Sequence, residues 1–106
     1  MKRLFGRARS SVEVSEARGV RTLHLGGDAI QSAIRLSKPG ALELAYTRAM
    51  LAFLLLEPAP RDVLMVGLGG GSIARFAHER LPDVRMTVVE VSAQVVAAAR
   101  TFFGLP

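Results

Sequence analysis

Apolar and polar residues alternate along the first third of the chain, between Val12 and Leu36. The alternation is clearest in "VEVS" (12–15) and "VRTLHL" (20–25), and glycines at 19, 26 and 27 interrupt it. A period of two places alternate side chains on opposite faces of a strand. The pattern therefore predicts short antiparallel strands near 11–17, 20–25 and 30–35. A sheet this small needs another surface to pack against.

The pattern changes to a helical period after Pro39-Gly40. Apolar residues now recur at spacings of three and four, at Leu42, Ala45, Ala49, Ala52, Phe53 and Leu56. Such spacing places them on one face of a helix, and proline ends a helix. We expect an amphipathic helix from Ala41 that ends before Pro58, followed by the stiff connector "EPAPRD".

The last part of the chain predicts strands that alternate with helices. Residues 63–66 form a continuous apolar run, as expected of a parallel strand covered on both faces. Residues 72–81 predict a helix stopped by Pro82, 86–89 a second such strand, and 93–103 a second helix. Strand, helix, strand, helix at this spacing is the opening of a parallel α/β sheet.

These segments predict an α/β protein in three parts. We expect a basic, flexible N-terminus over 1–10, a small antiparallel β domain over 11–38, and a helix plus the first half of a Rossmann-like nucleoside-binding domain over 39–106. A doubly wound sheet has roughly six strands, and only two are predicted here. We therefore expect the 106 residues to be the N-terminal fragment of a longer protein, poorly soluble or oligomeric and inactive alone.

The positive charge is concentrated at the N-terminus. The net charge is +5, and Lys2, Arg3, Arg7 and Arg9 supply four of those charges, which leaves about +1 for the rest. A body with so little charge has no basic face, and we expect no nucleic-acid partner. The open alternative is a short basic arm that contacts phosphates or acidic lipid.

The composition excludes several other kinds of site. There is no cysteine, which rules out disulfides and thiolate metal sites, and His24 and His78 are the only histidines. We expect no metal. The longest apolar run, residues 49–56, is too short to span a bilayer. We expect a cytoplasmic protein without a membrane partner.

The stretch "DVLMVGLGGGSIARFA" (62–77) carries the candidate chemistry. Gly67, Gly69 and Gly71 form G-x-G-x-G between a strand and a helix, and Ser72 stands where a helix N-cap is favoured. Glycine permits positive φ and lets backbone N–H groups approach a ligand. The alternative is a tight strand-to-helix turn without a ligand.

Glu90 lies 19 residues beyond Gly71, at the end of the second apolar strand. In nucleotide-binding α/β folds an acid at this place accepts hydrogen bonds from both ribose hydroxyls. A dinucleotide fingerprint would have glycine or alanine at the position of Ser72. The pattern instead favours an S-adenosylmethionine-type ligand, with a solvated strand end as the alternative for Glu90.

Four segments in register resemble the spermidine synthases, the polyamine aminopropyltransferase family: "GGDAIQSAI" (26–34), "LAYTRAMLAFLLLEPAP" (44–60), "VLMVGLGGGSIARF" (63–76) and "VVEVSAQVVAAARTFF" (88–103). The resemblance implies that Gln31 binds the nucleoside ligand and that Tyr46 lines the amine-acceptor pocket. It also implies that Gly67, Gly69 and Gly71 lie under the ligand and that Glu90 holds the ribose. The alternatives are a plain polar strand residue for Gln31 and a core-edge aromatic for Tyr46.

The sequence departs from the family at informative places. The family has aspartate inside the glycine turn where this chain has Gly70, Asp-Gly where it has Gly27-Asp28, and commonly Ile-Asp where it has Val91-Ser92. The family's main catalytic acids follow later strands that this chain does not contain, so the catalytic residues are unknown.

Three functions follow from these observations. The first is a fragment of a spermidine synthase-like aminopropyltransferase, which binds decarboxylated S-adenosylmethionine or S-adenosylmethionine and possesses half of the site. A full-length form would use a small-molecule nucleoside and a polyamine, and we expect it to be a homo-oligomer. The second is an S-adenosylmethionine-dependent methyltransferase, favoured by the missing acid at Gly70. The third is a non-catalytic module that pairs its sheet edge with a partner.

Overall fold

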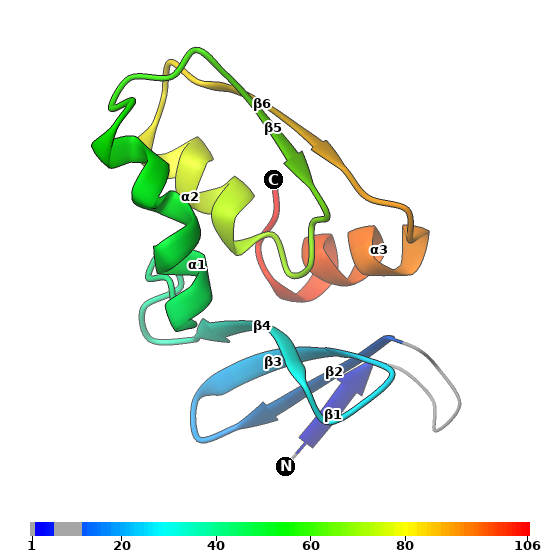
Figure 1. Cartoon of the computed structure of the whole chain (residues 1–106). Coiled ribbons are helices and arrows are strands. Elements are labelled where there is room, and N and C mark those ends of the chain that lie inside the picture. Colours follow the sequence, from blue (N-terminus) through cyan, green and yellow to red (C-terminus); the bar gives the residue numbers. More distant parts are fainter. Residues whose placement is uncertain (1, 6–11) are drawn as a thin grey trace.

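The computed structural model describes residues 2–5 and 12–106 and has an α/β architecture. Its elements in chain order are β1 (Lys2–Phe5), β2 (Val12–Ala17), β3 (Val20–Leu25), β4 (Ile30–Arg35), α1 (Ala45–Met50), the 3-10 helix η1 (Leu51–Leu55), β5 (Asp62–Val66), α2 (Ser72–Arg80), β6 (Arg85–Val89) and α3 (Ala93–Phe102). Figure 1 shows the N-terminal sheet at one end, the β5–β6 pair at the other, and α2 and α3 between them.

The N-terminal sheet is an antiparallel meander in the order β1-β2-β3-β4. The three strands expected at 11–17, 20–25 and 30–35 are present as β2, β3 and β4. Residues 1 and 6–10 of the expected flexible terminus, and residue 11 of the first expected strand, lie outside the described residues. The expectation is wrong for Lys2–Phe5, which pair with β2 as β1. Leu4 of this strand packs against the core. The strand was not predicted because it is short and lies in a basic segment.

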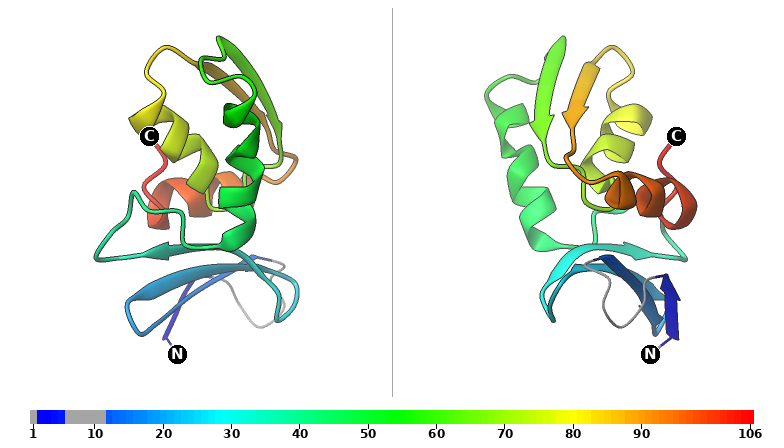
Figure 2. Two further views of the ribbon diagram at one scale, coloured as in Figure 1. Left: turned by 60° about the vertical axis from the view of Figure 1, so that its left-hand side comes forward. Right: turned by 90° about the vertical axis from the view of Figure 1, so that its right-hand side faces the viewer.

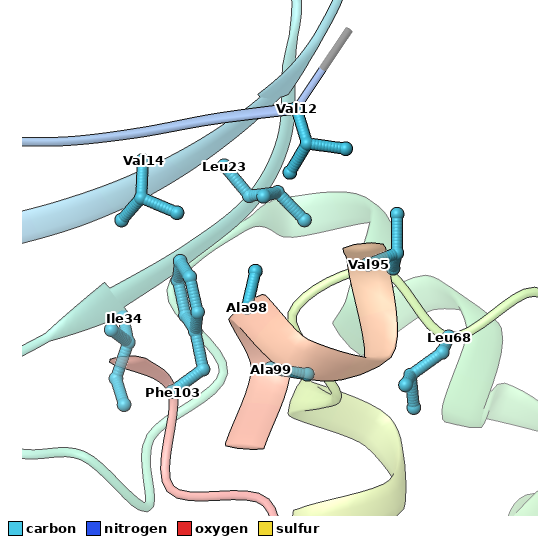
Figure 3. Close-up of a cluster of buried hydrophobic side chains, with 9 residues drawn as sticks. All are labelled: Val12, Val14, Leu23, Ile34, Leu68, Val95, Ala98, Ala99 and Phe103. Atoms are coloured by element: carbon cyan, nitrogen blue, oxygen red, sulfur yellow. The ribbon is translucent and has the colours of Figure 1, made fainter. Parts of the chain in front are cut away.

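One face of this sheet packs on α3. Figure 3 shows Val12, Val14 and Leu23 of the sheet facing Ala98 of α3 and Phe103 just beyond it. Phe103 is the largest of the fully buried side chains. Alternating valine and leucine residues supply the apolar face, and α3 covers it with small residues that allow close approach. The sheet thus has the packing surface that its size requires.

Two arginines tie the C-terminal end of α3 to other elements. Arg21 of β3 donates through Nη1 to the carbonyl of Phe102 at 2.7 Å, and its guanidinium also pairs with Glu16. Arg75 of α2 donates to the carbonyl of Phe103. The last carbonyls of a helix lack intrahelical partners and attract positive charge. Burial lowers the pKa of Arg75, and the carboxylate of Glu79 opposes that shift.

The second sheet is the parallel pair β5–β6, with Val63 beside Met86 and Val66 beside Val89. The parallel β-α-β arrangement expected from the sequence is confirmed. In Figure 1, α2 lies on one side of the pair and no ribbon lies on the other. One face of the pair is therefore uncovered among the described residues (Figure 1), although a continuous apolar run suits a strand that is covered on both faces.

The connecting helix differs from its predicted form. Helix α1 begins at Ala45 rather than Ala41 and tightens into η1. Leu44 is extended, and Arg48 donates through Nη1 to the carbonyl of Leu42 at 2.7 Å, which holds the preceding segment outside the helix. The predicted apolar face is mostly exposed, and Thr47 is the buried residue of α1. Figure 2 shows α1 and η1 standing along one side of the molecule.

Within residues 2–5 and 12–106, no helix has both the length and the apolar content needed to cross a membrane.

Candidate functional site

A cavity of about 270 Å³ lies at the carboxyl ends of β5 and β6, where β4 and α1 approach the glycine turn. Its lining includes Gln31, Tyr46, Gly67, Gly69 and Glu90, which are all of the predicted site residues except Gly71. The open carboxyl edge of a parallel sheet is where α/β proteins bind ligands. The structure thus brings together residues that were predicted from separate segments.

The glycine turn requires glycine at each of its three signature positions. Gly67, Gly69 and Gly71 have φ of +88°, +57° and +78°. These values lie in the left-handed region, where other L-residues are strained. Gly67 also donates its N–H to the carbonyl of Val89 at 2.7 Å, which fixes the turn to the end of β6. The three glycines and this hydrogen bond therefore set the shape of the turn beside the cavity.

Helix α2 starts differently from the sequence expectation. Gly71 is its N-cap, and Ser72 is the first helical residue rather than the cap. No side chain accepts a capping hydrogen bond from the first turn. Gly71, with its left-handed φ, occupies the N-cap position, so Ser72 lies one position further on, inside the helix. Gly71 itself faces away from the cavity, where a Cβ would lie 2.9 Å from Cδ1 of Leu105.

Ser32 of β4 holds the turn from the N-terminal sheet. Its Oγ accepts a hydrogen bond of 2.7 Å from the N–H of Gly70, and Ser32 is buried. A Cβ on Gly70 would lie 2.8 Å from Cβ of Ser32 and 3.0 Å from Cδ1 of Phe103. Position 70 therefore has no room for a side chain. Sequence reasoning missed Ser32, because a lone serine in a strand carries no distinguishing pattern.

Glu90 is half-buried just after β6, and its carboxylate joins the glycine turn to the start of α3. Its Oε2 accepts from the N–H of Leu68 at 2.8 Å, and its Oε1 accepts from the N–H of Ser92 at 3.1 Å. A carboxylate has about four lone-pair sites. Two backbone donors thus leave each oxygen able to accept one more hydrogen bond from the cavity.

Gln31 and Tyr46 meet on the opposite wall. The hydroxyl of Tyr46 donates to the backbone carbonyl of Gln31, which joins α1 to β4. The contact uses the main chain of Gln31, so its amide side chain is not part of it. Both residues are exposed at the rim of the cavity.

The remaining wall is mainly apolar. Met50, Met65 and Ile73 contribute thioether and aliphatic surface beside the carboxylate of Glu90. An apolar wall with a few placed polar groups is the usual form of a small-molecule site. Within the described part of the chain no three His, Cys, Asp or Glu residues are grouped to hold a metal. The arrangement suits a small molecule with an apolar part and a group that donates hydrogen bonds to the Glu90 carboxylate.

Known proteins provide an independent comparison. No family model matches the chain. A polyamine aminopropyltransferase of Chromobacterium violaceum is 50% identical over 99 residues, which are 93% of this chain and 38% of the relative. A crystal structure of a probable spermidine synthase from Corynebacterium glutamicum superposes with a TM-score of 0.75 at 25% identity, over 96% of this chain and 39% of that one.

A shorter match involves another class of enzyme. The eEF1A lysine and N-terminal methyltransferase homolog of Drosophila melanogaster is 44% identical over 45 residues, or 42% of this chain and 7% of the relative. The chain thus spans well under half of each of these proteins.

Proposed function

We propose that this chain, which is similar in sequence and fold to the N-terminal portion of the polyamine aminopropyltransferases, forms the nucleoside half of a transferase site. The ligand is decarboxylated S-adenosylmethionine or S-adenosylmethionine itself. The ribose hydroxyls donate to Glu90, and the glycine turn lies beneath the ligand. Gln31 contacts the nucleoside and Tyr46 lines the side where an amine acceptor enters.

The position of the Glu90 carboxylate carries this proposal. It lies on the cavity at the end of β6 and is fixed by the N–H groups of Leu68 and Ser92. Fixed in this way, the carboxylate needs no reorganisation when two hydroxyls bind, which lowers the entropic cost of binding. Aminopropyl transfer is a direct displacement at a sulfonium carbon and needs no enzyme nucleophile. The role of this half is therefore to orient the donor.

The test is calorimetric titration of the chain with S-adenosylmethionine, its decarboxylated form and methylthioadenosine. Replacing Glu90 with glutamine (Glu90→Gln) retains an oxygen that accepts from Leu68, but removes the negative charge. We expect affinity to fall roughly 10-fold or more, because a hydrogen bond to a charged group contributes about 1.5–3 kcal/mol. Glu57→Gln is the matched control, since Glu57 is exposed and outside the cavity lining.

Two results contradict the proposal. One is unchanged affinity in Glu90→Gln while Glu57→Gln is also unchanged. The other is no binding of any of the three nucleosides by the unsubstituted chain at millimolar concentration. Circular dichroism of each variant separates loss of binding from loss of structure.

A second candidate function is transfer of a methyl group. The methyltransferase match supports it, and so does the absence of a side chain at Gly70. S-adenosylmethionine carries a carboxylate that its decarboxylated form lacks, and an acid beside it would repel that carboxylate. Tighter binding of S-adenosylmethionine than of the decarboxylated form favours the methyltransferase, and the reverse order favours the aminopropyltransferase.

A further inference from the structure

Arg75 of α2 is a buried cation that lies outside the cavity lining and is 5% exposed. Its guanidinium donates through Nη1 to the carbonyl of Phe103, while its Nε is buried without a hydrogen-bond partner among the described residues. Burial of a charge costs free energy that only favourable contacts offset. The segments that Arg75 joins therefore indicate what the buried cation does in this fold.

The backbone and the side chain of Arg75 hold two different segments. Its N–H donates to the carbonyl of Gly71 at 2.8 Å, which closes the first turn of α2 directly after the glycine turn. Its guanidinium holds the carbonyl of Phe103, the C-cap residue of α3. The last carbonyls of a helix lack intrahelical partners and attract a cation. One residue thus joins the glycine turn to the C-terminal end of α3.

The segment at the end of α3 packs against the glycine turn. A Cβ on Gly70 would lie 3.0 Å from Cδ1 of Phe103. A Cβ on Gly71 would lie 2.9 Å from Cδ1 of Leu105. The N–H groups of Phe103 and Leu105 both donate to the carbonyl of Ala99, at 3.1 and 3.2 Å, so the two side chains belong to one hydrogen-bonded turn. The segment that the guanidinium holds is therefore also the segment that supports two glycines of the turn.

We infer that Arg75 is a positioning residue for the candidate site, because it holds Phe103 against Gly70 and so fixes the glycine turn. The cavity is affected through Leu68, which belongs to the same turn, lines the cavity and donates its N–H to Glu90. A binding site loses affinity when supporting residues no longer hold its contact groups in place. The inference rests on the proposed function for its effect on ligand binding, but its effect on the turn can be measured without a ligand.

Hydrogen exchange of the turn amides, measured by NMR on the isotope-labelled chain without nucleoside, tests this role directly. The N–H of Gly70 donates to Ser32, and the N–H of Leu68 donates to Glu90. In Arg75→Met we expect both amides to exchange roughly 10-fold faster relative to the amides of β2 and β3, because the hydrogen bond that is lost has a charged donor.

Arg21→Met is the matched control. Arg21 donates through Nη1 to the adjacent carbonyl of α3, that of Phe102, but it belongs to β3 and pairs with Glu16. Its loss should leave the relative exchange rates of the turn amides unchanged. A purely structural role of Arg75 predicts acceleration by one common factor at all amides, because global unfolding exposes each of them. A common factor, or selective acceleration in Arg21→Met as well, overturns the inference.

Leu105→Ala keeps the inference testable if Arg75→Met does not fold. This variant removes the contact on Gly71 and leaves the arginine in place. The N–H of Gly71 donates to the carbonyl of Leu68 at 3.0 Å, and we expect this amide to exchange faster in Leu105→Ala relative to the amides of β2 and β3. An unchanged rate would show that the end of α3 does not support the turn, which overturns the inference.

Titration of the same variants with methylthioadenosine tests the effect on binding. We expect affinity to fall roughly 10-fold in Arg75→Met and to be largely restored in Arg75→Lys, because lysine keeps the charge and can donate to the same carbonyl. If the unsubstituted chain binds but Arg75→Met binds equally well, the role of Arg75 is overturned and the proposed function stands. If the unsubstituted chain does not bind, the proposed function fails and the exchange rates alone decide whether Arg75 positions the turn.

Discussion

The two sheets of this chain contain similar side chains in opposite situations. Val14 and Leu23 of the N-terminal sheet are fully buried against α3, whereas Leu64 and Val66 of β5 are exposed. Hydrophobicity does not separate the two groups. What differs is the presence of a covering element, because burial requires a second surface at the right place. One face of the first sheet is therefore buried within the chain, whereas one face of the second sheet is exposed.

The candidate site lies where the two sheets meet. Ser32 belongs to the buried side of the first sheet and holds Gly70 of the turn that follows β5. Phe103 packs in the same core and lies 3.0 Å from the position of a Cβ on Gly70. The shape of the turn therefore depends on the packed sheet, while Gly67 and Glu90, which line the cavity, follow the strands of the exposed one.

The largest expected effect is the loss of the central side chain of the packed region. Phe103→Ala should lower the free energy of unfolding by about 3–5 kcal/mol, since it leaves a cavity between the sheet and α3. Urea denaturation followed by circular dichroism measures it. The same change at Phe53, which is partly exposed on η1, should cost much less. Equal losses at the two sites would remove the distinction between packed and exposed regions.

Gly70→Ala is expected to have the next largest effect. The new Cβ would overlap Ser32 and contact Phe103, and overpacking of this kind costs about 1–3 kcal/mol. Gly70 does not have a positive φ, so the cost is steric rather than conformational. Gly27→Ala is the control, because its φ is also not positive and a Cβ there meets nothing within 4 Å. A harmless Gly70→Ala would mean that the first sheet does not hold the turn.

Much of this architecture could be predicted from the sequence. Alternation located β2, β3 and β4, and the glycine turn with Glu90 located the edge of the cavity. Hydrophobic periodicity and turn-forming residues are local features, so they can be recognised in the sequence. The contact of Ser32 with Gly70 joins residues 38 positions apart and leaves no local trace. The apolar run of β5, with only one further parallel strand predicted, indicated that these strands need more covering, but it did not identify which side chains, such as Leu64, are exposed.

A smaller effect is expected for the arginine that ties the first sheet to α3. Arg21→Ala removes the hydrogen bond to the carbonyl of Phe102 and should cost about 1 kcal/mol, since the group is partly solvated. Arg85→Ala removes an ion pair with Asp62 on the second sheet, where both side chains are exposed. We expect no measurable change there by urea denaturation. A larger loss in Arg85→Ala than in Arg21→Ala would contradict this order.

A small effect is also expected for Val66→Thr, on the exposed side of the β5–β6 pair. Threonine has nearly the shape of valine but adds a hydroxyl, which costs about 1–3 kcal/mol where it is buried without a partner. Val14→Thr should show that cost, because Val14 is fully buried. Val66→Thr should stay within about 0.5 kcal/mol, since its hydroxyl remains in water. Equal costs at both valines would show that Val66 is covered in solution and would remove the contrast between the two sheets.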